Sequence, residues 1–284
     1  MQHSLVINVP CKINLHLSVG PRREDGYHAL KSIFLALDWG DRLCLEMKGP
    51  EGFWELSCDL LPDTEENLVT KAVQLFRERS GDMRGLSCRL EKRVPTGSGL
   101  GAGSSDAAMT LIALNRLLSN PLSREDLLSL ALRLGSDVPF FIDAGCAWVE
   151  GRGEILKALP LPKELYFVLV IPPIHSNTKE AFDALDRQRL EGLLFKESPP
   201  FEALLAALDH DPAQWPYYND FLPALMGRDD VEAREYSRLI DSLRAAGASY
   251  CGLSGSGSAC FGVFRSSERA VEATFILKKH WKEV

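Results

Sequence analysis

The sequence lacks the features that mark secreted, membrane-spanning and nucleic-acid-binding proteins. It has no apolar run near the roughly 20 residues that a transmembrane helix needs, and no basic stretch with an apolar run behind it opens the chain. The formal net charge of −7 opposes bulk binding to nucleic acid or to anionic membranes, although a local basic pocket is compatible with it. We therefore expect a cytoplasmic protein whose partner is a small molecule.

Paired cysteines are also missing. Seven cysteines are scattered from Cys11 to Cys260, and no two of them form a Cys-x-x-Cys pair. An odd number without that spacing is typical of reduced thiols, and it indicates neither a disulfide framework nor a zinc site. The chain shows no internal repeat or low-complexity segment, and nothing in it specifies an oligomeric state.

The N-terminal half contains mainly strand patterns. Residues 12–19 alternate between polar and apolar side chains, which predicts a half-buried strand with one polar face. Further strands are expected within 43–47, 53–60 and 86–94. Helices are expected from about 67, from 105 to 118, and between a Ser123 cap and Gly135.

The C-terminal half reads as an apolar strand, several helices, and two strands joined by a Gly-Ser loop. These strands are expected at 166–171, 250–253 and 259–264, and an amphipathic helix follows them. Strands and helices do not alternate regularly, so the pattern predicts an α+β fold. The segment Pro160-Leu-Pro162 suggests a boundary, giving expected domains of residues 1–160 and 161–284.

The most informative segment is a glycine-rich loop, Pro95-Thr-Gly-Ser-Gly-Leu-Gly-Ala-Gly-Ser-Ser-Asp-Ala-Ala108. Glycine at 97, 99, 101 and 103 lets the backbone approach a ligand closely. Ser104 and Ser105 are expected to open a helix whose free N–H groups point back into the loop. Backbone amides arranged in this way bind phosphate groups.

Other interpretations of the loop fit less well. A P-loop needs a lysine after its last glycine, and here Gly103 is followed by two serines. Residues 97–102 formally meet the dinucleotide pattern, but no strand ending in an acidic residue follows about twenty residues later. A flexible linker would not lie between an alternating strand pattern and an apolar helix pattern.

Residues 95–108 resemble the central motif of the GHMP kinases, the family that includes galactokinase, homoserine kinase and mevalonate kinase. Residues 10–15 and 253–260 are similar to its N-terminal motif and its C-terminal glycine loop. The resemblance implies transfer of a phosphoryl group from ATP, with Mg²⁺, to a hydroxyl, and it identifies no dedicated protein ligand for the metal. It also implies a mixed-sheet N-terminal nucleotide domain and a ferredoxin-like C-terminal domain.

Two further segments are similar to one branch of the family. The turn Asp25-Gly-Tyr-His28 and the segment 135–141, followed by 150–154, resemble the kinases that phosphorylate the 2-hydroxyl of 4-diphosphocytidyl-2-C-methyl-D-erythritol in the non-mevalonate route to isoprenoid precursors. The resemblance thins over residues 185–245. The alternatives are another GHMP kinase, which this turn opposes, and a regulatory nucleotide-binding protein without catalysis, which the presence of both Lys12 and Asp137 opposes.

The resemblance assigns Lys12 and Asp137 to catalysis. Asp137 precedes Val138 and Pro139, which suggests an extended loop. It is expected to accept the proton of the substrate hydroxyl, while Lys12 stabilises charge on that hydroxyl and on the transferred phosphoryl group. Taken without the motifs, a surface salt bridge for Lys12 and a helix-capping role for Asp137 would be the favoured interpretations.

The remaining expected contacts divide between nucleotide and substrate. Asn67 and Lys92 are expected beside the adenine, although Asn67 also suits a helix N-cap. Tyr27 and Phe182 are expected to stack on the cytosine and His28 to bond its edge, with Phe182 also compatible with a core position. The expected ATP-binding residues are Asn67, Lys92, Pro95, Thr96, Gly97, Ser98, Gly99, Leu100, Gly101, Ala102, Gly103, Ser104 and Ser105, and the expected substrate-binding residues are Asn14, Tyr27, His28 and Phe182.

Overall fold

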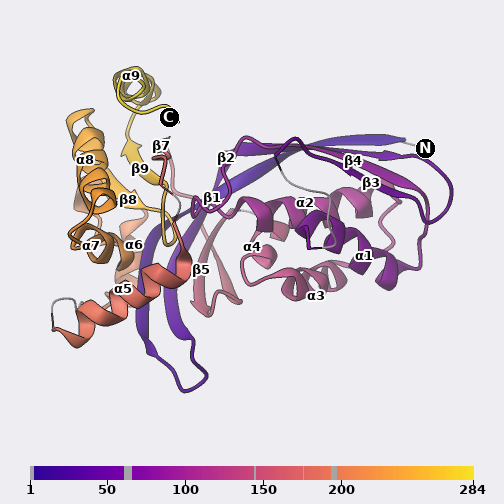
Figure 1. Cartoon of the computed structure of the whole chain (residues 1–284), viewed down its shortest axis with the longest axis horizontal. Helices are drawn as coiled ribbons and strands as arrows, with labels where there is room; N and C mark the ends of the chain where they lie inside the picture. The colour runs from indigo at the N-terminus through magenta and orange to yellow at the C-terminus, as the bar shows by residue number, and fades with distance from the viewer. Residues whose placement is uncertain (1–2, 61–65, 144, 175, 193–196) are drawn as a thin grey trace. The chain divides into compact units, whose positions relative to one another are not determined.

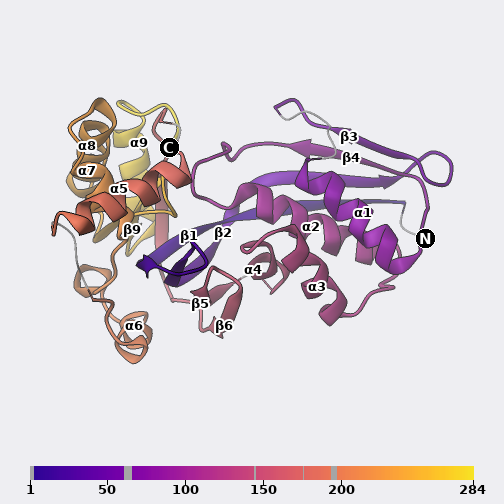
Figure 2. The same ribbon diagram turned by 60° about the horizontal axis from the view of Figure 1, so that its bottom comes forward.

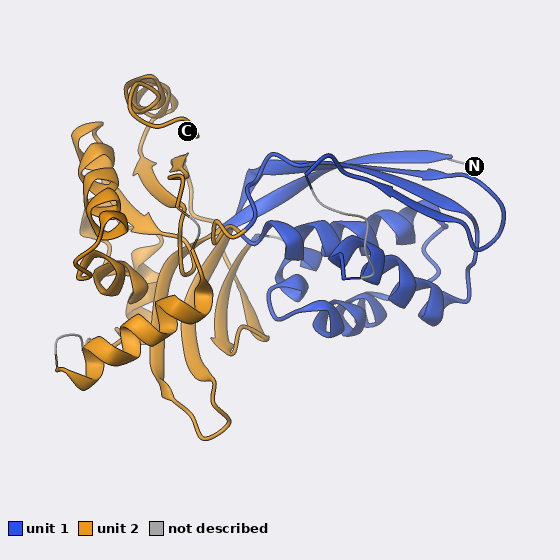
Figure 3. Ribbon diagram, in the orientation of Figure 1, with its two compact units in different colours: residues 1–12, 36–96, 101–145 blue, residues 13–35, 97–100, 146–284 orange. Residues whose placement is uncertain are grey.

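The chain forms two compact units, coloured separately in Figure 3. The computed structural model describes residues 3–60, 66–143, 145–174, 176–192 and 197–284. Unit 1 comprises residues 1–12, 36–96 and 101–145, and unit 2 comprises 13–35, 97–100 and 146–284. This division differs from the expected boundary at residue 160. Residues 146–151 belong to unit 2 because they pair with residues 30–35, which lie in the same unit.

Unit 1 packs helices along one side of a mixed sheet (Figure 1). Strand β4 (Leu86–Glu91) is antiparallel to the second half of β2 (His28–Met47) and parallel to β3 (Trp54–Ser57), while β1 (Ser4–Arg22) pairs with β2. The helices are α1 (Leu68–Ser80), α2 (Ala102–Leu117), α3 (Arg124–Leu134) and α4 (Val138–Asp143). The mixed sheet predicted for the N-terminal part is confirmed.

Capping residues explain where two of these helices begin and end. The Asn67 side chain accepts a hydrogen bond of 2.9 Å from the N–H of Val69, so its predicted role as the N-cap of α1 is confirmed. Ser123 and Asp126 form a capping box at α3, and Gly135 follows the last residue of that helix, as predicted.

Helix α2 begins three residues earlier than expected. The prediction placed its start near Ser105, because glycine and serine are weak helix formers. In the structure Gly101 is the N-cap, with a left-handed φ of 70°, and the helix starts at Ala102. Gly103, Ser104 and Ser105 therefore lie in the first turn of α2 rather than in the loop before it.

Unit 2 contains a hairpin and a separate antiparallel sheet with its helices (Figure 2). The hairpin strands β5 (Cys146–Gly151) and β6 (Ile155–Leu159) were not predicted; β5 pairs with residues 30–35 of β2. The second sheet has the order β7-β9-β8, from Tyr166–Val170, Cys260–Phe264 and Tyr250–Leu253. The helical segments are α5 (Thr178–Leu190), α6 (Phe201–Ala207), a 3₁₀ turn (Pro212–Gln214), α7 (Phe221–Met226), α8 (Val231–Ala245) and α9 (Ser267–Leu277). None of the helices in the described ranges is long and apolar enough to cross a membrane.

The C-terminal sheet has the element order of a ferredoxin-like domain. That motif runs β-α-β-β-α-β, and β7, the following helices, β8, β9 and α9 supply its first five parts. The sixth part is reduced to one antiparallel bridge, in which the N–H of Ile171 donates to the carbonyl of Glu283 over 3.0 Å. Buried side chains from α8, including Tyr236, Leu239 and Leu243, pack on this sheet.

Strand β1 is buried on both faces, so the expected half-buried strand is wrong. Its polar side chains have low exposed fractions: 4% for Lys12, 3% for Asn14, 0% for His16 and 9% for Ser18. Hydrogen bonds satisfy this polar face. Within unit 2, Asn14 donates to the hydroxyl of Ser32, and His16 contacts Ser198 and the N–H of Tyr218.

Candidate active site

Unit 1 brings the two predicted catalytic residues together. The ammonium of Lys12 on β1 lies 3.7 Å from the carboxylate of Asp137, whose side chain is 33% exposed. Burial lowers the pKa of Lys12, and the nearby carboxylate of Asp137 opposes that shift without cancelling it. The pair therefore consists of a desolvated cation beside a carboxylate that solvent, or a substrate, can reach.

Asp137 lies in a turn and not in the extended loop that was expected. The turn joins α3 to α4, and Val138 and Pro139 form the first residues of α4. Proline is tolerated in the first turn of a helix, where its missing N–H would have no helical partner. The turn presents Asp137 at the start of α4.

The start of α2 lies directly against Lys12. A Cβ added at Gly101 would be 3.1 Å from Cγ of Lys12 and 3.1 Å from Cζ of Phe141, so these side chains would have to shift slightly, and the φ of 70° also favours glycine. The first N–H groups of a helix have no partners inside the helix. The predicted phosphate-binding amides of α2 and the predicted catalytic pair thus belong to one part of unit 1.

Two features of the first turn of α2 suit an oxygen-rich ligand. The hydroxyl of Ser105 is buried and has no hydrogen-bond partner among the described residues. Gly103 is exposed, and a Cβ there would meet only Cδ1 of Leu68 at 3.7 Å. The chain therefore leaves open space beside Gly103 and an unsatisfied hydroxyl nearby in the same turn.

The first half of the glycine-rich loop is held within unit 2. The carbonyl of Gly99 accepts a bond of 2.9 Å from the hydroxyl of Ser254, and that of Ser98 accepts one of 2.9 Å from the N–H of Ala259. A Cβ at Gly99 would be 2.2 Å from the carbonyl oxygen of Ser254, which explains the glycine. The central motif and the C-terminal glycine loop, far apart in sequence, therefore meet here.

Asn14, in the N-terminal motif, contacts the C-terminal glycine loop. Its side-chain oxygen accepts a bond of 2.8 Å from the N–H of Gly255, and its amide nitrogen donates to Ser32. Both of these contacts are internal to unit 2. The structure thus gives Asn14 a part in holding the C-terminal glycine loop, while its predicted contact with the substrate stays a prediction.

The predicted cytosine-binding residues include one stacked pair of rings. The imidazole of His28 lies on Phe182 of α5 with centroids 4.8 Å apart and an interplanar angle of 27°, and Phe182 meets Phe221 edge-on. Phe182 is therefore partly a core residue, which was the alternative to a substrate contact. Tyr27 is 55% exposed, with the guanidinium of Arg152 over its ring at 4.9 Å.

Both ring nitrogens of His28 have partners within unit 2. Nδ1 donates to the carbonyl of Gly20 over 2.9 Å, and Nε2 lies 3.3 Å from the carboxylate of Asp186. The expected bond from the imidazole to the base edge would require Asp186 to give up its contact. The sequence reasoning missed Asp186.

Arg189 was missed in the same way. Its guanidinium donates to the carbonyls of Gly20 and Val19 and pairs with Asp220 at 3.1 Å. Residues 182, 186 and 189 share one face of α5, so the i, i+4, i+7 spacing was the available signal. Through Arg189, this face of α5 binds Val19 and Gly20 of β1, close to the turn that contains Tyr27.

Family models match both parts of the chain. The model of the GHMP kinase N-terminal domain matches residues 67–145, and the model of the GHMP kinase C-terminal domain matches residues 220–283. A 4-diphosphocytidyl-2-C-methyl-D-erythritol kinase of Burkholderia thailandensis is 36% identical over 277 residues, which cover 96% of this chain and 89% of the relative. The chain belongs to the GHMP kinases.

Further similar proteins support membership of this family. A 4-diphosphocytidyl-2-C-methyl-D-erythritol kinase of Burkholderia pseudomallei is 38% identical over 280 residues, covering 96% of this chain and 89% of the relative. A crystal structure of a 4-(cytidine 5'-diphospho)-2C-methyl-D-erythritol kinase matches with a TM-score of 0.84 and 34% identity, covering 98% of this chain and 96% of that one. A homoserine kinase from Cytophaga hutchinsonii matches with a TM-score of 0.67, 22% identity, and coverage of 98% and 90%, which supports the GHMP kinase fold alone.

The predicted adenine-side residue Lys92 has an engaged ammonium. It lies between the carboxylates of Asp41 and Asp106, and its side chain is 2% exposed. Two of the three N–H donors of this ammonium are therefore already used within the protein. Asp41 and Asp106 were not predicted as site residues. Asp41 lies outside the motifs, and Asp106 lies within residues 95–108 but was given no role there.

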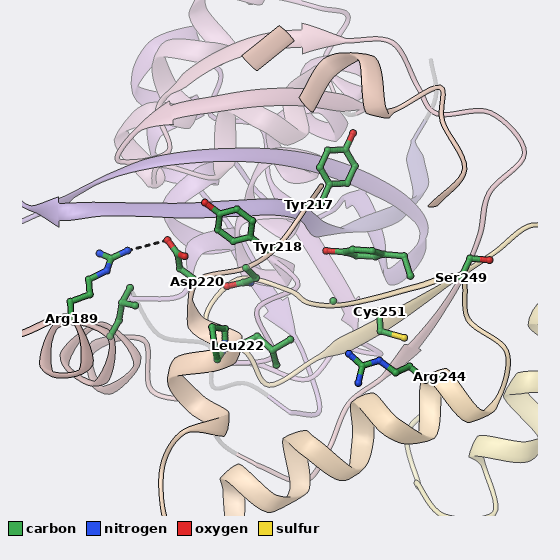
Figure 4. Close-up of a pocket in the computed structure, with 13 residues that line it drawn as sticks. Arg189, Tyr217, Tyr218, Asp220, Leu222, Arg244, Ser249 and Cys251 are labelled. Atoms are coloured by element: carbon green, nitrogen blue, oxygen red, sulfur yellow. Dashed lines mark hydrogen bonds and ion pairs between the residues drawn. The ribbon is translucent and has the colours of Figure 1, made fainter. Parts of the chain in front are cut away.

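Unit 2 also contains a cavity that no sequence-predicted site residue lines (Figure 4). Its volume is about 540 Å³, and the Arg189–Asp220 ion pair forms one side. The hydroxyl of Tyr217 donates to Leu204 within the protein, and that of Tyr250 donates to Leu15. Its aromatic residues therefore use their polar groups in the fold.

The cysteines of this chain are free thiols, which agrees with the reduced state expected from the sequence. Burial raises the pKa of Cys11 to about 12, and it does the same for Cys88 and Cys146. A thiol with so high a pKa is a poor nucleophile at neutral pH. These cysteines are packing residues.

Proposed function

We propose that this GHMP kinase transfers the γ-phosphoryl group of ATP to the 2-hydroxyl of 4-diphosphocytidyl-2-C-methyl-D-erythritol, a step of the non-mevalonate route to isoprenoid precursors. Its similarity to kinases named for this substrate supports the choice of substrate. One geometric observation supports the chemistry. The Lys12–Asp137 pair lies beside Gly101, at the start of the helix whose first turn has free backbone amides.

ATP would be bound mainly through backbone groups of residues 95–105, with Asn67 and Lys92 bordering the adenine. The first turn of α2 supplies N–H groups and the buried hydroxyl of Ser105 toward the phosphates. Mg²⁺, bound together with the nucleotide, would neutralise charge on the phosphate oxygens.

Asp137 would accept the proton of the attacking hydroxyl, because its carboxylate is partly exposed and held next to a cation. Lys12 would stabilise negative charge on the reacting oxygens. Asn14, Tyr27, His28 and Phe182 would hold the cytidine end of the substrate. The proposed partners are thus small molecules, and we propose no contact with nucleic acid or membrane.

A substrate panel tests this function. ATP consumption is measured with Mg²⁺ and the cytidylylated methylerythritol, homoserine, mevalonate or galactose as acceptor. We expect turnover of the cytidyl compound and poor turnover of the other three. Faster turnover of any of those three would reject the proposed substrate while leaving a GHMP kinase of another specificity.

A further inference from the structure

A buried charge cluster lies in unit 1, outside the catalytic pair. It consists of Asp41, Lys92 and Asp106, whose side chains are 1, 2 and 3% exposed, and we call it the carboxylate–lysine cluster. The ammonium of Lys92 donates to Asp106 over 2.8 Å and also to Asp41. Two carboxylates thus share one ammonium in the interior of the unit.

The cluster contacts both ends of the glycine-rich segment. Besides binding Lys92, Asp41 accepts hydrogen bonds of 2.5 and 2.8 Å from the N–H groups of Arg93 and Val94, which immediately precede Pro95. Asp106 immediately follows Ser105 on α2. The chain therefore enters residues 95–105 from one member of the cluster and leaves them at another.

We propose that Asp41, Lys92 and Asp106 are positioning residues that fix the two ends of residues 95–105, and so the direction of the phosphate-binding amides. This inference rests on the proposed function of that segment. Stability alone does not account for the arrangement, because apolar residues of similar volume are often as stabilising as a buried ion pair. Directional hydrogen bonds to an ammonium and to two successive backbone N–H groups specify a geometry that apolar packing would not.

One carboxylate of the cluster has a shifted pKa, so a pH dependence gives a second way to test its role. Burial raises the pKa of Asp106 to about 7, even though Lys92 lowers it, and one oxygen of Asp106 is buried without a partner. The other groups that face it are Asp41 and the thiol of Cys88, and burial raises the pKa of Cys88 to about 12. Asp106 is thus the member expected to change charge near neutral pH, and its hold on Lys92 should weaken when it is protonated.

The test uses two measurements on the full chain: ATP affinity by calorimetry, and amide hydrogen exchange of residues 96–105 without nucleotide. The variants are Asp41→Asn and Asp106→Asn. The control is Asp126→Asn, which breaks the Arg79–Asp126 ion pair and the α3 capping box in the same unit. Temperatures are chosen so that each variant is equally far below its own unfolding midpoint.

We expect Asp41→Asn to speed exchange in the loop and to weaken ATP binding by about tenfold or more, as small misplacements of binding groups do. Asp126→Asn should leave both unchanged. In Asp106→Asn, the ATP affinity should lose the pH dependence between pH 6 and 8 that the parent protein shows beyond that of ATP itself.

Other outcomes overturn the inference. If loop exchange and ATP affinity in Asp41→Asn match those of Asp126→Asn, the cluster only stabilises unit 1. If the ATP affinity of Asp106→Asn depends on pH as that of the parent protein does, Asp106 is not a positioning residue. Failure of the parent protein to bind ATP would reject the proposed function, while the exchange data on the nucleotide-free chain would still decide whether the cluster holds the loop.

Discussion

The pKa values of two buried lysines in unit 1 are shifted in opposite directions. Lys12 lies 3.7 Å from Asp137, a carboxylate with a third of its side chain exposed, and burial lowers its pKa. Burial would also lower the pKa of Lys92, but Asp106 and Asp41 outweigh it and the pKa is raised. The two residues share a residue type and low exposure, and they differ in the number and the burial of their carboxylate partners.

This difference fits the two proposed roles, catalysis for Lys12 and positioning of residues 95–105 for Lys92. A cation with a lowered pKa has surplus capacity to stabilise new negative charge, as arises on a transferred phosphoryl group. A cation shared by two buried carboxylates has little such capacity, because its charge is already compensated. Burial alone would not have distinguished Lys12 from Lys92; their partners do.

The largest effect should come from the exposed partner of Lys12. Asp137→Asn keeps the shape of the side chain but removes its basicity and charge. We expect kcat to fall by about 10²–10⁴-fold, the usual contribution of a general base, with little change in substrate affinity. Steady-state kinetics measures this, with circular dichroism to confirm folding. Full kcat in a folded variant would reduce Asp137 to a positioning role.

Lys12→Met should lower kcat by a comparable factor, because the cation and the base act on the same event. Combined with Asp137→Asn, it should give a double variant much less impaired than the product of the two single effects. The double-mutant cycle in kcat is the measurement. A strictly multiplicative result would mean that the two groups act independently.

Replacing Lys92 should lower the free energy of unfolding more than replacing Lys12. Lys92→Met leaves two buried carboxylates without a cation and should destabilise the protein by about 3–5 kcal/mol. Lys12→Met leaves Asp137 partly exposed to water, so we expect a change below about 1 kcal/mol. Urea unfolding of both variants gives the comparison, and equal losses would contradict the contrast between the two sites.

Gly103→Val tests the first turn of α2, which starts beside Lys12 and leads to Asp106, a partner of Lys92. The added side chain would meet only Leu68 in the described structure, so the fold should be kept. It would occupy the space proposed for the phosphates, and ATP binding should weaken by about tenfold or more. Calorimetry measures the affinity, and Leu132→Val, at an exposed position on α3, serves as a control. Near-normal affinity in folded Gly103→Val would reject the phosphate-binding interpretation.

The last effect concerns pH and the cluster around Lys92. Because the pKa of Asp106 is raised from its usual value to about 7, the folded protein holds a proton between about pH 4 and 7 that the unfolded chain has released. Its contribution to stability should therefore fall as pH rises through that window, by at most about 1.4 kcal/mol per pH unit. Asp106→Asn should lack this decline when unfolding is followed at several pH values. A parallel profile would show that other groups cause it.

Motifs allowed much of the site to be predicted. Lys12 and Asp137 were paired from sequence, and the structure places their charged atoms 3.7 Å apart. The caps at Asn67 and Ser123 followed from local hydrogen-bonding chemistry, which is encoded within a few residues. Such features need no knowledge of distant contacts.

The misses depend on contacts between distant residues. The alternation in β1 indicated one exposed face, but the covering groups come from 18 to more than 200 residues away, such as Ser32, Asp220 and Gly255. Asp186 and Asp41 likewise matter only through partners outside their own segments, His28 and Lys92. No local pattern reports such partners, so periodicity and motif spacing could not reveal them.

The order in which the chain is synthesised has a bearing on β1. Its residue Asn14 is bonded to Gly255, 241 positions later, and His16 is bonded to Tyr218, 202 positions later. During translation, this polar stretch must leave the ribosome long before its partners exist. Closing such long loops is entropically demanding and makes folding slow. We therefore expect the nascent chain to expose β1 for most of its synthesis, and to depend on chaperones or on low expression temperature for a good yield of folded enzyme.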